Sequence, residues 1–136
     1  MRKVEFTILG NPASKKNSQQ IVYPKGRKPI IVQSKTYKDY EKACKQFMPK
    51  MDKPIDYPVN IRYLFYRKDK RRCDESNLIA AADDILVKYG VVLDDNYTIV
   101  VGHDGTRVFV DPNAPRTEVR ITEVLPFGME EEELEE

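Results

Sequence analysis

Three segments of the chain alternate between apolar and polar residues, which is the pattern of β-strands that bury one face. They are residues 4–9, 59–66 and 117–122. The apolar residues of the middle segment fall on one face: Ile61, Tyr63 and Phe65. The other face of that segment would carry Asn60, Arg62, Leu64 and Tyr66. We therefore expect three long strands, each with one side in a hydrophobic core.

Two other segments repeat their apolar residues at helical spacing. In residues 35–47 the apolar residues are three or four positions apart, and Ser34 just before them suits an N-cap. Residues 75–88 carry a continuous apolar stripe, and Gly90 suits the position after the last helical turn. We expect these segments to be the two main helices.

Shorter apolar runs complete the pattern. Residues 21–23 and 29–32 flank a basic turn and predict a hairpin, and residues 97–101 and 107–110 predict two strands separated by a turn at Asp104. The order is strand, hairpin, helix, strand, helix, strands. This order predicts an α+β fold, a single small domain with one mixed β-sheet and two main helices.

Charge is unevenly divided along the chain. The formal net charge is +1, but six of the last seven residues are glutamates. Without them the chain carries 23 basic and 16 acidic residues, a net charge of +7. We expect a basic domain over residues 1–128 and an acidic, disordered tail over residues 129–136. The tail could also compete with a polyanion for the basic surface.

Several classes of protein are excluded by the sequence. No apolar run approaches the length of a membrane span, and the N-terminus lacks the pattern of a signal peptide. The two cysteines, Cys44 and Cys73, are not spaced as metal ligands. We expect a cytoplasmic protein with reduced thiols and no contact with a membrane.

Acidic residues stand at both ends of the second predicted helix. Asp74 lies at its start, where an aspartate often serves only as an N-cap. Asp94 and Asp95 follow its end, and neighbours in an extended segment point to opposite sides, so we expect one of the two to face a site. Alone, each acid also fits a cap or a turn. Together they could hold Mg²⁺ or Mn²⁺.

The second predicted helix also has polar residues beside its apolar stripe. Asn77 and Asp84 are seven residues apart, so they lie on nearly the same edge of the helix. Asp83 points in a different direction, and we expect it on the surface. The single histidine, His103, stands beside a predicted turn; we expect a turn residue, with a general base or a phosphate contact as alternatives.

Basic residues surround the same region. One group directly precedes Asp74, a second follows the first strand, and a third occupies the tip of the predicted hairpin. Lysine and arginine at such positions bind phosphates, and each phosphate neutralised makes binding more sensitive to salt. The candidates for phosphate contacts are Lys15, Lys16, Lys25, Arg27, Lys70, Arg71 and Arg72.

At these residues the chain resembles the RusA family of Holliday junction resolvases, which are bacterial and phage endodeoxyribonucleases. The family pattern is a basic stretch, then Asp-x-Asp-Asn-Leu-x-Lys-Ala, a helix, and Gly-x-x-x-Asp-Asp. The chain has Asp-Glu-Ser-Asn-Leu-Ile-Ala-Ala at 74–81 and Gly-Val-Val-Leu-Asp-Asp at 90–95. The similarity extends over most of the chain, from Gly-Asn-Pro at 10–12 to the last predicted strand.

The resemblance implies a small mixed α/β fold, a homodimer, and Mg²⁺- or Mn²⁺-dependent cutting of four-way DNA junctions in recombination and repair. Carried over by position, Asp74 and Asp95 match metal-binding aspartates, Asp84 a common helix aspartate and Asn77 the motif asparagine. The resemblance thus gives catalytic candidates (Asp74, Asn77 and Asp95) and metal ligands (Asp74, Asp84 and Asp95).

The chain departs from the family pattern at two positions. The second motif aspartate is replaced by Ser76, and the motif lysine by Ala80. Asp84 is the best candidate for the missing acid by helix geometry. The missing cation has four candidates among which the sequence does not choose: Lys70, Arg71, Arg72 and Lys88. The departures leave open a non-catalytic protein that binds branched DNA on the same fold.

Overall fold

The computed structural model describes residues 2–15, 19–33 and 35–125, without the side chains of residues 19–20 and 31–33. Its elements in chain order are β1 (Lys3–Leu9), β2 (Gln19–Val22), β3 (Ile30–Gln33), α1 (Lys35–Cys44), a 3₁₀ turn η2 (Lys45–Phe47), β4 (Val59–Arg67), α2 (Glu75–Lys88), β5 (Val100–Gly102), β6 (Arg107–Val110) and β7 (Arg116–Glu123). Three sequence predictions lie outside the described residues: the cap at Ser34, the phosphate contact at Lys16 and the tail at 129–136.

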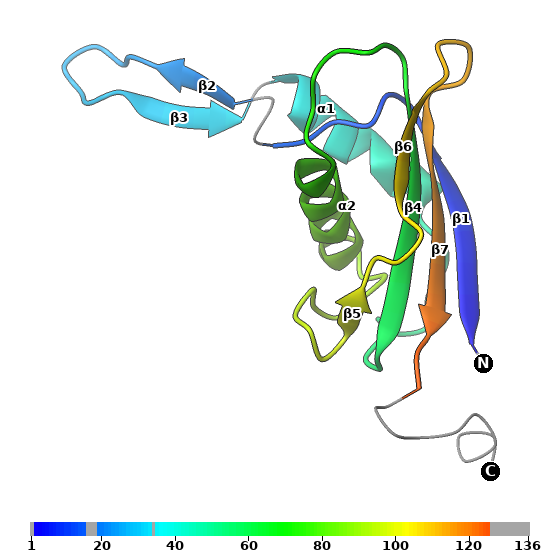
Figure 1. Cartoon of the computed structure of the whole chain (residues 1–136). Coiled ribbons are helices and arrows are strands. Elements are labelled where there is room, and N and C mark those ends of the chain that lie inside the picture. Colours follow the sequence, from blue (N-terminus) through cyan, green and yellow to red (C-terminus); the bar gives the residue numbers. More distant parts are fainter. Residues whose placement is uncertain (1, 16–18, 34, 126–136) are drawn as a thin grey trace.

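The body of the protein is one mixed β-sheet covered by helices on one face (Figure 1). Strand β7 pairs antiparallel with β1 on one side and with β4 on the other, while β5 and β6 pair parallel with β4. The α+β prediction with a mixed sheet and two main helices is therefore confirmed. None of the described helices is long and apolar enough to cross a membrane.

The two strands of the far edge lie one after the other along β4. Strand β5 pairs near Val59, and β6 pairs with the stretch from Leu64 to Arg67. The first of them is shorter than predicted, because the amides of Ile99 and Val100 bond the carbonyl of Asn96 and turn the chain there. The sequence had placed a strand over residues 97–101.

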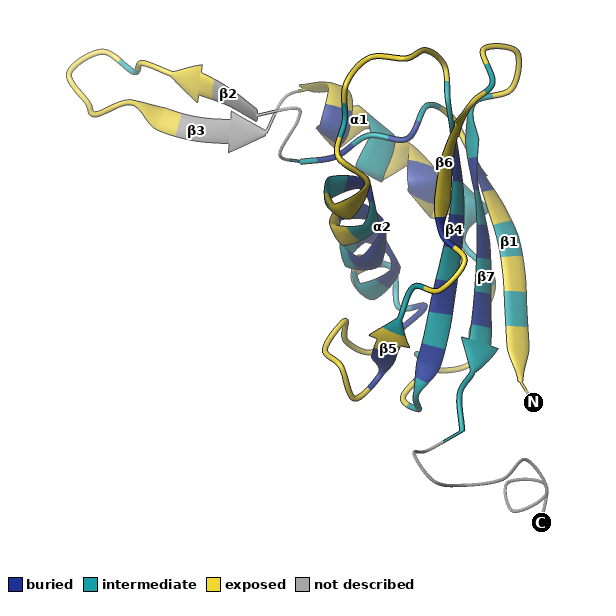
Figure 2. Ribbon diagram, viewed as in Figure 1, coloured by how far each residue is buried: buried dark blue, intermediate teal, exposed yellow. Residues whose placement is uncertain are grey.

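Burial alternates along the central strands as the sequence predicts. The residues of β4 that face the helices, Ile61, Tyr63 and Phe65, are fully buried with their neighbours on β7. Leu78, Ile85 and Leu86 of α2 pack on them and complete the core. Figure 2 shows the alternation along β4 and β7, and the more exposed outer strands β1 and β6.

Helix α2 has the bounds that the sequence predicts, Glu75 to Lys88. It ends because Gly90 adopts a positive φ of 73°, a conformation that glycine enters without steric cost. After the glycine the chain returns to the core, where Val91 and Val92 are buried and Val92 bridges Ile55. The start of α2 and the turn at Gly90 thus determine the positions of the acidic residues at the two ends of the helix.

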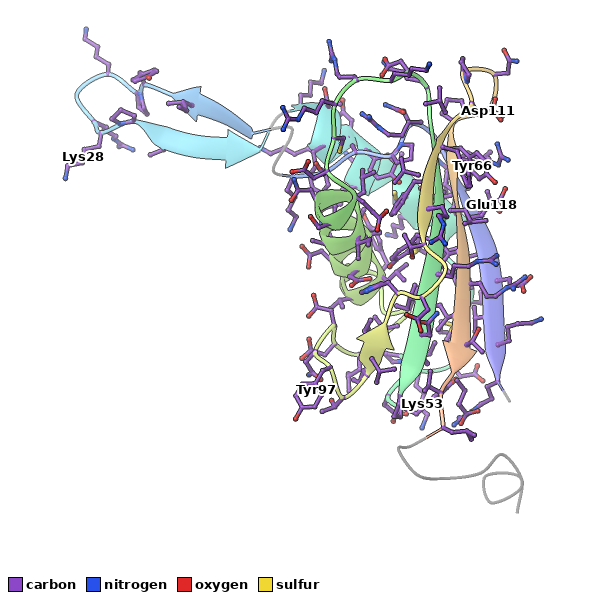
Figure 3. All side chains as sticks on the ribbon, viewed as in Figure 1. Lys28, Lys53, Tyr66, Tyr97, Asp111 and Glu118 are labelled. Carbon is purple, nitrogen blue, oxygen red and sulfur yellow. The ribbon has the colours of Figure 1, made fainter. Side chains whose placement is uncertain are left out.

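The predicted hairpin is confirmed as β2 and β3, which pair antiparallel. It projects away from the sheet and forms a separate two-stranded ribbon (Figure 1). Lys25 and Arg27 at its tip are exposed, and Figure 3 shows Lys28 at the end farthest from the body. The arm therefore presents its basic tip apart from the hydrophobic core.

Candidate functional site

Asp74 presents an open carboxylate at the start of α2. It occupies the N-cap position with an extended backbone, φ −78° and ψ 134°, yet its side chain makes no capping hydrogen bond. Its backbone carbonyl accepts the amides of Asn77 and Leu78, at 3.1 and 3.3 Å. The Asp74 carbonyl therefore accepts the first hydrogen bonds of the helix, while its exposed carboxylate stays open to solvent.

A basic pocket of about 250 Å³ lies immediately before Asp74, between the loop after β1 and the loop after β4. Its lining includes four cationic side chains and one carboxylate: Arg67, Lys68, Arg71, Arg72 and Asp69. This excess of positive charge suits phosphate groups. Of the predicted phosphate contacts, Arg71 and Arg72 line the pocket, and Lys70 lies exposed between residues that do.

The pocket is built by a set of backbone contacts. The Lys68 amide donates to Asn11 Oδ1 at 2.9 Å, which ties the two loops together. The Arg71 amide donates to Asp69 Oδ1 at 2.9 Å, and the Arg67 guanidinium donates to the Arg71 carbonyl. The sequence pattern did not predict Asn11, Arg67 and Lys68 as site residues. The Gly-Asn-Pro turn was the available signal for Asn11, because an Asn side chain often binds nearby backbone there.

Asp84 lies on the flank of α2 and forms an ion pair with Lys15, whose Nζ is 3.0 Å from Oδ2. Both side chains are partly exposed, so the pair is weak and open to exchange. As predicted, Asp84 lies beside the core and does not point fully into water, and Asn77 is likewise half-buried. The structure thus places the predicted phosphate contact Lys15 beside a predicted metal ligand.

The two acids after α2 have different local roles. Asp94 Oδ1 accepts the Asp95 amide at 2.7 Å, and its Oδ2 accepts from the Asn96 amide group at 3.0 Å. These bonds, the Asp95 amide first, lower the pKa of Asp94. Asp94 therefore closes a turn, whereas Asp95 is exposed and supplies the more open carboxylate.

Asp95 lies in a negatively charged neighbourhood. Partial desolvation raises its pKa, and the nearby Asp94, Asp84 and Asp83 add to the effect. A group of carboxylates that raises the pKa of one member is a place where a cation would be stabilised.

Asp74 is distant from this acidic neighbourhood within one molecule. Figure 1 shows the segment that enters α2 and the segment that leaves it at opposite ends of the helix. Asp84 follows Asp74 by ten residues, a separation of about 15 Å along the axis. Across residues 2–15, 19–33 and 35–125, no three His, Cys, Asp or Glu side chains are grouped so that they could hold a metal ion. One copy of the chain therefore does not assemble Asp74, Asp84 and Asp95 around one cation.

The prediction that Asp83 is a surface residue is wrong. Its side chain is buried, where Oδ1 accepts the Tyr63 hydroxyl at 2.6 Å and Oδ2 lies 2.8 Å from His103 Nε2. Burial first, and then the charge of Asp83, raise the pKa of Tyr63 well above its ordinary value. The connection between β5 and β6 covers the flank of α2, and helical spacing alone does not reveal this cover.

His103 is a turn residue, as predicted, and also part of this buried network. Its carbonyl accepts the Thr106 amide at 3.1 Å, while its ring stacks on Tyr63 with centroids 5.9 Å apart. The three side chains join β4, α2 and the β5–β6 connection. They hold the helix flank that carries Asp84 against the edge of the sheet.

Comparison with known proteins identifies one family. The sequence model of the family described as Endodeoxyribonuclease RusA matches residues 10–122. That range begins directly after β1 and ends one residue before the end of β7, so it includes the basic pocket, α2 and the acidic loop. No curated protein sequence matches the chain.

Proposed function

Because the chain belongs to the RusA family of endodeoxyribonucleases, we propose that it resolves four-way (Holliday) DNA junctions by symmetric phosphodiester hydrolysis in recombination and repair. The observation that supports this best is the basic pocket that opens beside the uncapped carboxylate of Asp74. A phosphodiester bound by Arg71 and Arg72 would lie next to a carboxylate that makes no capping hydrogen bond.

DNA binding would draw on two basic surfaces. The pocket before α2 offers Lys70, Arg71 and Arg72, all exposed. The hairpin tip offers the exposed Lys25 and Arg27, and Figure 3 shows their neighbour Lys28 far from the body, which suits a second arm of branched DNA. Each contact would neutralise a phosphate and release counterions.

We propose that cleavage depends on Mg²⁺ or Mn²⁺ and that a second copy of the chain completes the ligand set. Among the described residues of one copy, no three carboxylates gather at one point, because Asp74 and Asp95 lie at opposite ends of α2. In a two-fold dimer, the start of α2 in one copy can lie beside the acidic loop of the other copy. The symmetry creates two such sites. Asn77, one turn into α2, would then support Asp74 from the same end.

The surfaces that such a dimer would join are complementary. The start of α2 carries Arg71 and Arg72, and the loop after α2 carries Asp94 and Asp95. Leu93 and Tyr97 flank these acids with 58% and 83% of their surface exposed, and exposed apolar side chains of this kind are typical of protein contacts. Two symmetric sites would also suit two symmetric cuts in a junction.

Mixing two inactive variants tests the proposal. Asp74→Asn and Asp95→Asn should each abolish cleavage of a synthetic junction, while Asp52→Asn, an exposed acid in another loop, should cleave like wild type. After subunit exchange, half of the dimers would carry both substitutions in one site and none in the other, which restores about a quarter of the wild-type sites. Single nicks in the mixture support shared sites.

The outcomes of this test are separable. If wild type cuts neither with Mg²⁺, nor with Mn²⁺, nor with the two together, the nuclease activity is refuted. If wild type cuts and the mixture stays inactive although heterodimers are present by native mass spectrometry, each site belongs to one copy. If Asp74→Asn cuts normally, Asp74 has no part in the reaction.

A second candidate function is a non-catalytic protein that binds branched DNA. The observation in its favour is that Ser76 and Ala80, which replace a family aspartate and lysine, are exposed on α2 where those side chains would have been presented. This candidate predicts tight junction binding, insensitive to EDTA, and intact strands with either metal.

A further inference from the structure

One row of side chains crosses the open face of the sheet near the end of β4. The strand register places Leu9, Arg116, Tyr66 and Phe109 side by side on β1, β7, β4 and β6. The Arg116 guanidinium lies 3.8 Å from the centroid of the Tyr66 ring. On the other side, the Phe109 ring is stacked on Tyr66 with centroids 5.1 Å apart and an interplanar angle of 26°. We call Arg116, Tyr66 and Phe109 the aromatic row.

The aromatic row is held in a fixed position from one end. Arg116 donates to Asp111 at 3.0 Å, to Glu118 at 2.8 Å and to the Ala114 carbonyl at 2.9 Å. Figure 3 shows Tyr66, Asp111 and Glu118 together at this end of the sheet. The charge of Arg116 is thus balanced locally, and its role is to orient the Tyr66 ring. A pre-ordered ring loses little conformational entropy when a ligand binds.

The other end of the row is uncovered. Phe109 belongs to the edge strand β6, and 44% of its surface is exposed. Arg107, two residues earlier on the same side of the strand, is also exposed. Its guanidinium donates to the Thr106 carbonyl at 2.8 Å and forms no ion pair with a described residue. Arg62, in the middle of this face, lines a hollow of about 310 Å³ together with Arg120, Glu5 and Glu118. The two glutamates form ion pairs with Arg120 and Arg116, whereas Arg62 Nε has no hydrogen-bond partner within the described part of the chain.

An exposed aromatic ring beside arginines that form no ion pair with a described residue is a combination that binds single-stranded nucleic acid. Bases stack on the ring whatever their sequence, and the arginines neutralise the phosphates. Strand β4 ends at Arg67, which lines the basic pocket, so the pocket lies at the end of the sheet nearest the aromatic row. The charge pattern favours a nucleic acid over an apolar protein partner.

We propose that Phe109 is a stacking platform for an unpaired base, and that Arg107 and Arg62 bind the phosphates of the same single strand. The site lies on the helix-free face and is separate from the acids of α2. It rests on the proposed function only for the source of the strand, which would be the unpaired nucleotides of a branched DNA.

Binding of a 20-nucleotide oligothymidine, labelled with fluorescein and measured by anisotropy in EDTA, tests the site without metal or cleavage. Phe109→Ala should weaken binding about tenfold, the effect expected for losing one stacked base. Val101→Ala, which shortens a similarly exposed apolar side chain on β5, should bind like wild type. Circular dichroism would show that both variants keep the wild-type fold.

A direct reading of stacking is available because the chain contains no tryptophan. In Phe109→Trp the single indole should be quenched when the oligonucleotide binds, whereas in Val101→Trp it should not. The proposal is overturned if Phe109→Ala binds like wild type, or if Phe109→Trp is unquenched at saturation. It is also overturned if the emission of Phe109→Trp without DNA changes on dilution, since a second copy would then cover the face.

Failure of this proposal is distinguishable from failure of the nuclease proposal. If the protein cuts junctions but shows no stacking at Phe109, only the stacking site is refuted. If oligothymidine quenches the indole of Phe109→Trp but the protein never cuts a junction, the stacking site is supported and the proposed nuclease activity is refuted.

Discussion

The hydroxyl of Tyr63 should contribute measurably to stability, because it is the buried donor to Asp83. The substitution Tyr63→Phe removes one hydrogen bond of 2.6 Å and leaves the packing of the ring unchanged. A hydrogen bond to a charged group contributes about 1.5–3 kcal/mol, so the free energy of unfolding should fall by about 2 kcal/mol. For a domain of this size, that corresponds to a Tm lower by roughly 8 °C.

A double-mutant cycle in urea isolates this hydrogen bond. In an Asp83→Ala background, Tyr63→Phe should cost nothing further, which gives a coupling energy of about 2 kcal/mol. Tyr97→Phe is the matched control, because its hydroxyl is solvated on an exposed ring. The reasoning fails if Tyr63→Phe changes stability by less than about 0.5 kcal/mol, or costs the same in both backgrounds.

Three further predictions concern other parts of the molecule. Arg71→Ala should reduce the slope of log K against log salt for duplex DNA binding by about one, measured by anisotropy, and an unchanged slope would exclude a phosphate contact. Gly90→Ala should lower the free energy of unfolding by about 1 kcal/mol in a urea titration, because its φ of 73° is strained for alanine; an unaffected midpoint would contradict this. Hydrogen bonds from the side chain and amide of Arg2 lower the pKa of Glu123, so its stabilisation is present above the unfolded pKa and lost as pH falls through the folded one. Glu123→Gln should therefore be less stable than wild type at pH 7 and equal to it once the pH is below the folded pKa in thermal melts, and a constant difference would refute the linkage.

The elements around the site were predictable because local signals agreed with one another. The apolar stripe of α2 ends where Gly90 allows the helix to stop, and the alternation along β4 matches its buried face. A helix of 14 residues is also about 21 Å long, so the separation of Asp74 from the acids after α2 was already implied by the sequence.

Other features depend on tertiary contacts that no local pattern contains. Asp83 lies beside the apolar stripe, and whether such a residue is exposed is decided by the chain that covers it, here the segment with His103. The parallel pairing of β5 and β6 along one edge of β4 likewise follows from where the chain returns after α2. The aromatic row joins residues of three strands through the sheet register, which individual strand patterns do not supply.

The most direct measurement of the proposed function is a map of cut positions on a synthetic four-way junction. Each strand would be labelled at its 5′ end in turn, with Mg²⁺, Mn²⁺ or EDTA, beside a linear duplex of the same sequence. The proposed function predicts two cuts at symmetric positions on opposing strands, only in the junction and only with metal. Four intact strands under tight binding, or the same cuts in the linear duplex, would contradict it.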